Sequence, residues 1–161
     1  MSGKIENIGP ALEVFERIRR SFDNSALLNR LGLAAIRFIK SRTRRGIDVD
    51  GVPFRAYSER WAKIRKAEGL PTSYVNLEFD DYSGMLQRMD HVVANDLQSV
   101  TVLFTDDEKD KIAGYHSYTG AGRGRVKRPF FFLSRDENDQ LRGIVQAEIN
   151  LLLNNLNLSE G

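Results

Sequence analysis

Hydrophobic positions recur every three or four residues up to residue 45, which is the spacing of one buried helix face. Pro10 opens the first such segment, and Asp23-Asn-Ser interrupts the pattern before a second segment that runs to Gly46. The apolar positions are Leu12, Phe15, Ile18 and Phe22, then Leu27, Leu28, Leu31, Ala35 and Phe38. The pattern predicts an N-terminal helical part, residues 8–45, as a helical hairpin or one long broken helix.

Turn residues separate this part from a short helix. Glycine and proline lie on either side of Asp50-Gly51 within residues 46–54, which predicts an extended loop whose turn pins Phe54 beneath a sheet. Ser58 is placed to cap the short helix, which we expect to end at residues 69–71.

The hydrophobic period then changes to the alternation of β-strands. Residues 74–79, 91–94 and 99–104 read as strands, and the last two are joined through Asn95-Asp96. This connection predicts a hairpin. Between the first and second strands, Tyr82 to Met89 predicts a helical turn or short helix.

Two shorter patterns follow the hairpin. Asp106 is an acidic cap for a short helical element around Ile112. The run Phe130 to Leu133 predicts a buried strand or a strand-like insertion.

The C-terminal pattern is helical. Ser134 and Glu137 have the spacing of a capping box, and a polar tail, residues 154–161, closes the chain. The helix between them carries an apolar stripe of Leu141, Ile144, Val145 and Leu152. The sequence therefore predicts a single α+β domain over residues 1–161, with N-terminal helices, a small antiparallel sheet and a C-terminal helix.

Composition narrows the chemistry. The 161 residues include no cysteine, which excludes disulfides, thiolate metal sites and a cysteine nucleophile. The opening MSGKIENIGP lacks an apolar signal core, and no run approaches the roughly 20 apolar residues that cross a bilayer. We expect a soluble protein made in the cytoplasm, without a membrane partner. The formal net charge of +2 does not by itself require a nucleic-acid partner.

The charges are unevenly distributed along the chain. The cations gather at Arg37, Lys40, Arg42, Arg44 and Arg45, and again at Arg60, Lys63, Arg65 and Lys66. The acids gather at Glu78, Asp80 and Asp81, and again at Asp106, Asp107, Glu108 and Asp110. Solvated faces of short helices are the simplest interpretation. The alternative is that the Arg37 to Arg45 face meets the Asp106 to Asp110 face of a neighbouring copy in a ring.

The segment from Ile112 to Ser134 concentrates unusual residues: IAGYHSYTGAGRGRVKRPFFFLS. Its glycines match neither the dinucleotide spacing nor a P-loop, and an apolar run follows them instead of a helix, so the pattern does not indicate a nucleotide cofactor. Its cations are Arg123, Arg125, Lys127 and Arg128. They could contact DNA phosphates or an acidic protein surface, but the aromatics form a block rather than interleaved stacking positions.

Metal and catalytic interpretations have little support in the sequence. His91 and His116 are the only histidines, and they lie in separate segments without carboxylates at ligand spacing. We interpret His116 as a hydrogen-bonded structural or interface residue, and Tyr57 and Trp61 as core or interface anchors. We predict no catalytic, cofactor or metal site and no enzymatic activity.

Three stretches in the same order resemble the phage virion morphogenesis family, the tail-completion proteins of Mu-like and P2-like phages. The first, residues 39–63 (IKSRTRRGIDVDGVPFRAYSERWAK), is similar to the family's Arg-Thr helix end, Asp-Gly turn, Pro-Phe, Tyr-Ser and aromatic-Ala-Lys helix. The second, residues 77–86, resembles its Ser/Thr-Gly-Met segment, with extra bulk at residues 78–82. The third is the segment from Ile112 to Ser134, lengthened at residues 117–119.

The resemblance implies a structural, noncatalytic protein that completes the tail or joins it to the DNA-filled head, and a fold similar to small phage neck ring proteins. Its implied partners are neck, portal or connector, and tail-tube or terminator proteins, other copies in a homo-oligomeric ring, and incidentally the packaged DNA. Its implied location is the head–tail junction of the virion. The alternatives are a tail-terminator ring, a transient assembly factor and, from another class, a sequence-independent DNA-binding module.

Overall fold

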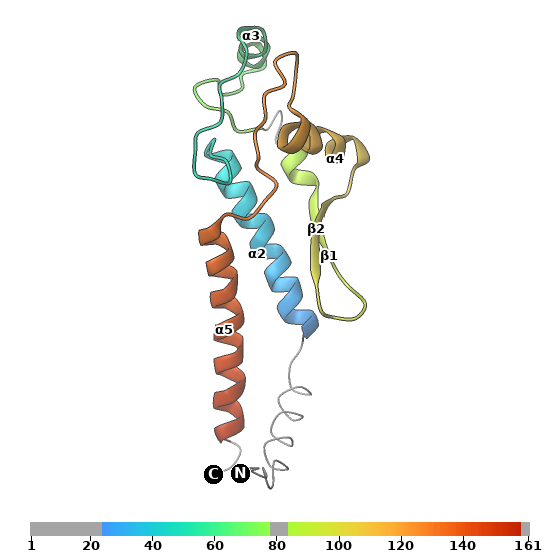
Figure 1. Cartoon of the computed structure of the whole chain (residues 1–161), viewed down its shortest axis with the longest axis vertical. Coiled ribbons are helices and arrows are strands. Elements are labelled where there is room, and N and C mark those ends of the chain that lie inside the picture. Colours follow the sequence, from blue (N-terminus) through green and yellow to red (C-terminus); the bar gives the residue numbers. More distant parts are fainter. Residues whose placement is uncertain (1–23, 78–83, 159–161) are drawn as a thin grey trace, which may run out of the picture.

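The computed structural model describes residues 24–77 and 84–158, and the side chains of the last helix through residue 155. Two long antiparallel helices form its frame, α2 (Asn24–Arg44) and α5 (Arg135–Leu158). A short helix, α4 (Asp107–Gly114), lies near one end of this frame, and α3 (Glu59–Ala67) lies beyond it (Figure 1). The expected helix at Leu12 to Phe22 lies outside the described residues.

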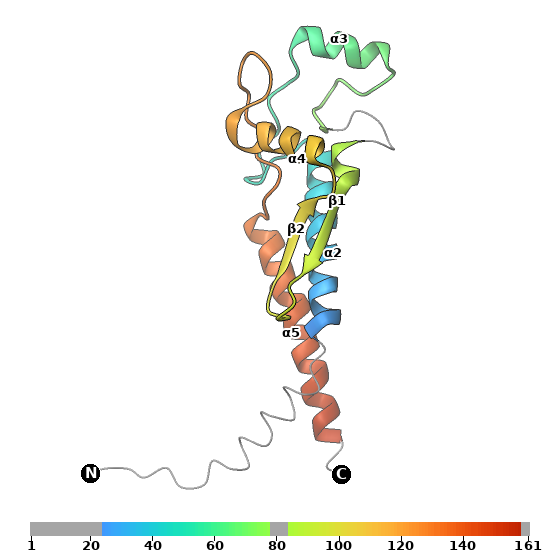
Figure 2. The same ribbon diagram turned by 90° about the vertical axis from the view of Figure 1, so that its right-hand side faces the viewer.

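The sheet is a single hairpin packed against α2 (Figure 2). Strands β1 (Met89–Val93) and β2 (Val100–Phe104) are antiparallel, with Met89 opposite Phe104 and Val93 opposite Val100. A 3₁₀ turn, η1 (Met85–Arg88), precedes β1, and a π-helical turn, η2 (Tyr115–Thr119), extends α4. The α+β layout predicted from the sequence is therefore confirmed, including the hairpin and the turn before it.

Local capping signals set the helix starts. The Ser58 side chain accepts a hydrogen bond from Trp61 N, and the Asp106 carboxylate accepts hydrogen bonds from Glu108 N and Lys109 N. Each bond satisfies a backbone donor that has no partner within its helix. The predicted starts of α3 and α4 are confirmed.

The capping box at α5 forms as predicted. Ser134 N donates to Glu137 Oε2 (2.7 Å), and Glu137 N donates to Ser134 Oγ (3.2 Å). Helix α5 continues through Leu158, so residues 154–158 of the predicted polar tail are helical. Apolar side chains of this end remain exposed, with Leu151 54% and Leu153 40% accessible.

Two strand predictions fail. Residues 74–77 are irregular, while 78 and 79 lie outside the described part. Residues 130–133 are also irregular, because their backbone oxygens bond to a side chain instead of to a strand: Arg42 donates to the carbonyls of Phe130 and Phe132 (2.7 Å each). The predicted burial is correct for Phe130, whereas Phe132 is 39% exposed, and strand pairing depends on a neighbour that the sequence pattern does not reveal.

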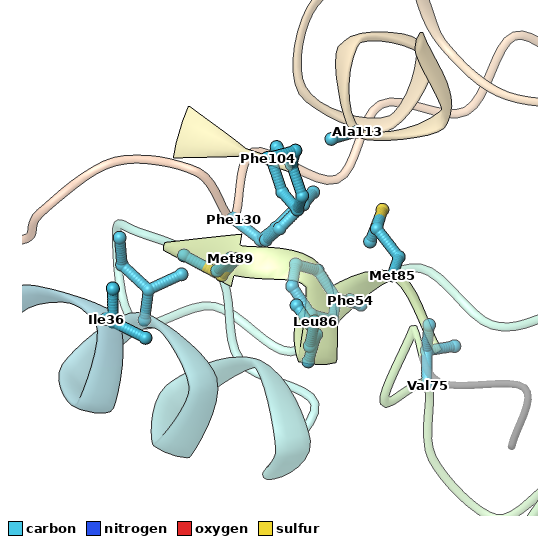
Figure 3. Close-up of a cluster of buried hydrophobic side chains, with 10 residues drawn as sticks. Ile36, Phe54, Val75, Met85, Leu86, Met89, Phe104, Ala113 and Phe130 are labelled. Atoms are coloured by element: carbon cyan, nitrogen blue, oxygen red, sulfur yellow. The ribbon is translucent and has the colours of Figure 1, made fainter. Parts of the chain in front are cut away.

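The core draws on segments far apart in the sequence (Figure 3). Phe130 and Leu86 are fully buried, and Phe54 is 8% exposed. Phe130 packs edge-on against Phe104, with ring centroids 6.4 Å apart. The expected burial of Phe54 is confirmed; it packs in the same cluster as Met85 and Val75, next to the start of the hairpin.

Candidate interaction surfaces

Arg42 is an internal residue and not part of a surface. Only 4% of it is exposed, and its guanidinium pairs with Glu137 as well as with the carbonyls of Phe130 and Phe132. A buried cation needs a charged partner and further acceptors, and these groups supply both. The prediction that Arg42 contributes to a contact face is therefore wrong: it joins α2 to the start of α5.

The end of α2 carries two cations at the surface. Arg44 and Arg45 are exposed there. Helix α2 ends where Gly46 adopts a positive φ of 77°, and a Cβ at that position would approach the backbone oxygen of Val75 to 3.0 Å. This turn directs the following chain across the core.

The loop after Gly46 is held from both sides. The Asp48 carboxylate accepts from Asp50 N (3.0 Å) and Val52 N (2.8 Å), while Val49 N donates to Pro129 O (3.0 Å). Aspartate commonly stabilises turns in this way. The loop after Gly46, which belongs to the stretch 39–63, thus lies directly against the segment from Ile112 to Ser134.

Arg128 is the second cation that the sequence analysis misplaced. It is 6% exposed, and its guanidinium donates to the carbonyls of Arg55 (2.9 and 3.1 Å) and Ala56 (3.3 Å). Burial lowers the pKa of Arg128, while Tyr57 acts in the opposite direction. Its role is to fix one loop to another, so it does not face DNA or a partner.

Two guanidinium groups lie over the ring of Tyr57. The Arg65 Cζ atom is 4.6 Å from the centre of its ring, and that of Arg128 is 5.7 Å away. Arg65 is 2% exposed and also donates to Pro71 O and Asn76 Oδ1. Tyr57 is half-buried as an anchor, whereas Trp61 is 40% exposed and is not a core residue.

The glycine-rich loop has a defined turn. Ala121 and Val126 exchange two backbone hydrogen bonds (3.0 and 3.1 Å), and Arg125 N donates to Gly122 O. Gly120 has φ 89°, and a Cβ there would lie 2.2 Å from Arg125 O, so only glycine fits. The exposed tip of this loop, residues 120–127, carries Arg123, Arg125 and Lys127.

The acidic candidates have different roles. The Asp106 carboxylate caps α4, and its two backbone hydrogen bonds help to lower its pKa. Asp107 and Asp110 are exposed on the same helix. Both, like the exposed Glu108 beside them, present carboxylates that do not cap the helix.

His116 lies at the base of the glycine-rich loop. Its backbone oxygen accepts a hydrogen bond from Arg128 N (2.6 Å). Burial, and secondarily the charge of Arg128, lowers the pKa of His116 to about 4, so the ring is neutral at pH 7. Within the described structure its Nδ1 atom is buried without a hydrogen-bond partner.

The sequence reasoning missed three features. It interpreted Glu137 only as a local cap, because no residue near Glu137 in the sequence indicates a partner 95 residues away. It did not anticipate that Tyr57 links two arginines. It also missed an open apolar groove of about 480 Å³ between α2, β2 and α5, whose lining includes Leu31, Ala35, Val100, Val102, Leu141 and Val145.

No protein-family model, no curated protein and no solved structure matches the chain. Within residues 24–77 and 84–158, no group of three or more histidine or acidic side chains is arranged to hold a metal ion. No helix in that same part is both long and apolar enough to cross a membrane.

Proposed function

We propose that the protein is a structural component of a phage, which completes the tail and joins it to the DNA-filled head. The observation that carries the proposal is the convergence of the three stretches that resemble the virion morphogenesis family. Arg42 of the first stretch bonds to the Phe130 carbonyl of the third, and Met85 of the second packs in the same core as Phe54 and Phe130.

Because of this convergence, the residues that resemble the family share one structural role. The Arg-Thr helix end, the Asp-Gly turn and the Arg-Pro-Phe run are separated in sequence, yet they stabilise one another around Phe130. Residues that share a core are constrained together, whereas isolated matching motifs need not be. The proposal therefore rests on a set of mutually dependent positions.

The proposal includes a ring of identical subunits, each using two different faces. Arg44 and Arg45 would meet Asp107 and Asp110 of the neighbouring copy. Such heterologous contacts close after a fixed number of copies, and complementary charges set their register. Arg42 and Asp106 do not take part, because they are occupied inside the subunit.

A charge-reversal pair tests the ring. Arg44→Glu with Arg45→Glu should block assembly into particles without unfolding the subunit, because both side chains are exposed. Adding Asp107→Lys and Asp110→Lys should restore assembly if the two faces meet. Normal particle yield from the arginine variant, or no recovery in the combined variant, contradicts this pairing.

The function itself is tested by electron microscopy of particles from a phage that lacks this gene, with purified protein added back. Full heads beside finished but unattached tails, rescued by the protein, support the joining role. Tails of abnormal length favour a terminator ring instead. Normal infectious particles without the gene contradict both roles.

A further inference from the structure

Two basic segments that are far apart in the sequence lie at the same end of the molecule. Both views show α3 and the glycine-rich loop at the end remote from the C-terminal half of α5 (Figures 1 and 2). We call residues 55–68 and 120–127 together the basic end. Its exposed cations are Arg55, Arg60, Lys63, Lys66, Arg123, Arg125 and Lys127.

The two segments are held together by specific contacts. Arg128, directly after the loop, donates to the carbonyls of Arg55 and Ala56, just before α3. The ring of Tyr57 then contacts the guanidinium groups of Arg128 and of Arg65 in α3. The interior arginines thus tie the loop to the segment before α3, which keeps the exposed cations of both segments at the same end of the molecule.

The two segments of the basic end contain few acidic residues. Glu59 and Glu68 are the acids of residues 55–68, and residues 120–127 contain none. The cations also project from a helix and from a loop tip, and three of the seven are lysines. Lysine is depleted in protein–protein interfaces, whereas arginine and lysine together are the usual partners of phosphate oxygens.

We propose that the basic end binds the phosphate backbone of double-stranded DNA without reading its sequence. Arginine and lysine neutralise phosphates and release condensed counterions, which drives binding in a salt-dependent way. The inference adds a ligand to the proposed function but does not depend on it. It assigns to α3, as much as to the loop, a role in contacting DNA.

The test measures binding of the full chain to a fluorescently labelled 20-base-pair duplex by anisotropy, between 50 and 200 mM NaCl. If six cations each neutralise one phosphate, log K should fall with log salt at a slope of about −5, and the affinity should fall about 10³-fold over this range. A duplex of scrambled sequence should bind equally well.

Three triple variants, which change the net charge equally, locate the surface. The loop variant is Arg123→Glu, Arg125→Glu and Lys127→Glu; the α3 variant is Arg60→Glu, Lys63→Glu and Lys66→Glu; the control is Arg37→Glu, Arg135→Glu and Arg142→Glu on α2 and α5. All nine side chains are exposed, so circular dichroism should show folded proteins. The loop and α3 variants should each lose about half of the salt slope, and the control should retain most of it.

Several results would overturn the proposal. One is the absence of duplex binding at 50 mM NaCl, and another is a loss of salt slope in the control variant equal to that in the loop and α3 variants. Tighter binding of polyglutamate than of DNA would assign the surface to an acidic protein. If a single-stranded oligonucleotide binds more tightly than the duplex, and this binding is lost in Trp61→Ala, the ligand is single-stranded DNA instead of the duplex. Because this assay needs no particles, its failure is distinguishable from a failure of the add-back experiment.

Discussion

The buried pair between Arg42 and Glu137 gives the sharpest test of how this fold is held together. Arg42→Met would remove the cation that pairs with the Glu137 carboxylate. Glu137 is 8% exposed, so its charge would be left buried and unpaired. It would also remove the donors to the Phe130 and Phe132 carbonyls. Breaking one side of a buried pair costs about 3–5 kcal/mol, so we expect the free energy of unfolding to fall by that amount.

A second substitution separates charge from shape. Glu137→Gln keeps a side chain that can complete the capping box with Ser134 but removes the buried charge. In the double variant Arg42→Met with Glu137→Gln, much of the loss should therefore be recovered, because no uncompensated ion remains. The double variant should still be less stable than the original protein, because the carbonyls of Phe130 and Phe132 lose their donor.

The assay is urea unfolding followed by circular dichroism, with the midpoint and the slope fitted separately. Arg142→Met is the matched control, because it breaks an exposed pair with Asp139 on the same helix and should cost less than about 0.5 kcal/mol. A loss below about 1 kcal/mol for Arg42→Met, or a double variant less stable than the single one, would refute the reasoning.

Three further predictions concern the core and its edges. Phe54→Ala should lower the free energy of unfolding by about 3–5 kcal/mol in urea melts, and a change below about 1 kcal/mol would contradict its burial. Gly32→Ala should cost about 1–3 kcal/mol, because its Cβ would lie 2.4 Å from the His91 ring, whereas Gly143→Ala, with nothing within 4 Å, should stabilise α5. The pKa of His116 lies below its unfolded value of 6.5, so the stability from its neutral ring is complete above pH 6.5 and is lost as the pH falls through about 4. His116→Gln should reduce the loss of unfolding free energy between pH 6.5 and about 4, measured by urea melts at several pH values. An unchanged pH dependence of stability in this variant would contradict the assignment to His116.

The sequence determined the elements whose signals are local. Helix α2, the hairpin, and the starts of α3, α4 and α5 each follow from spacing and capping residues within a few positions of one another. The turn at Asp50-Gly51 and the burial of Phe54 follow from such signals as well. These interactions act over one or two turns of chain, so composition and period suffice to predict them.

Only the tertiary structure decided which charges are interior. Arg42 and Arg128 belong to basic runs that read as surface, yet each is buried because acceptors from distant segments surround its guanidinium. Phe130 is fully buried, but the run from Phe130 to Leu133 is not a strand, since the carbonyls of Phe130 and Phe132 have a side-chain donor in place of a neighbouring strand. Burial of a charge and pairing of a strand both depend on partners supplied by long-range packing, and so does the bonding of Arg128 to the segment before α3.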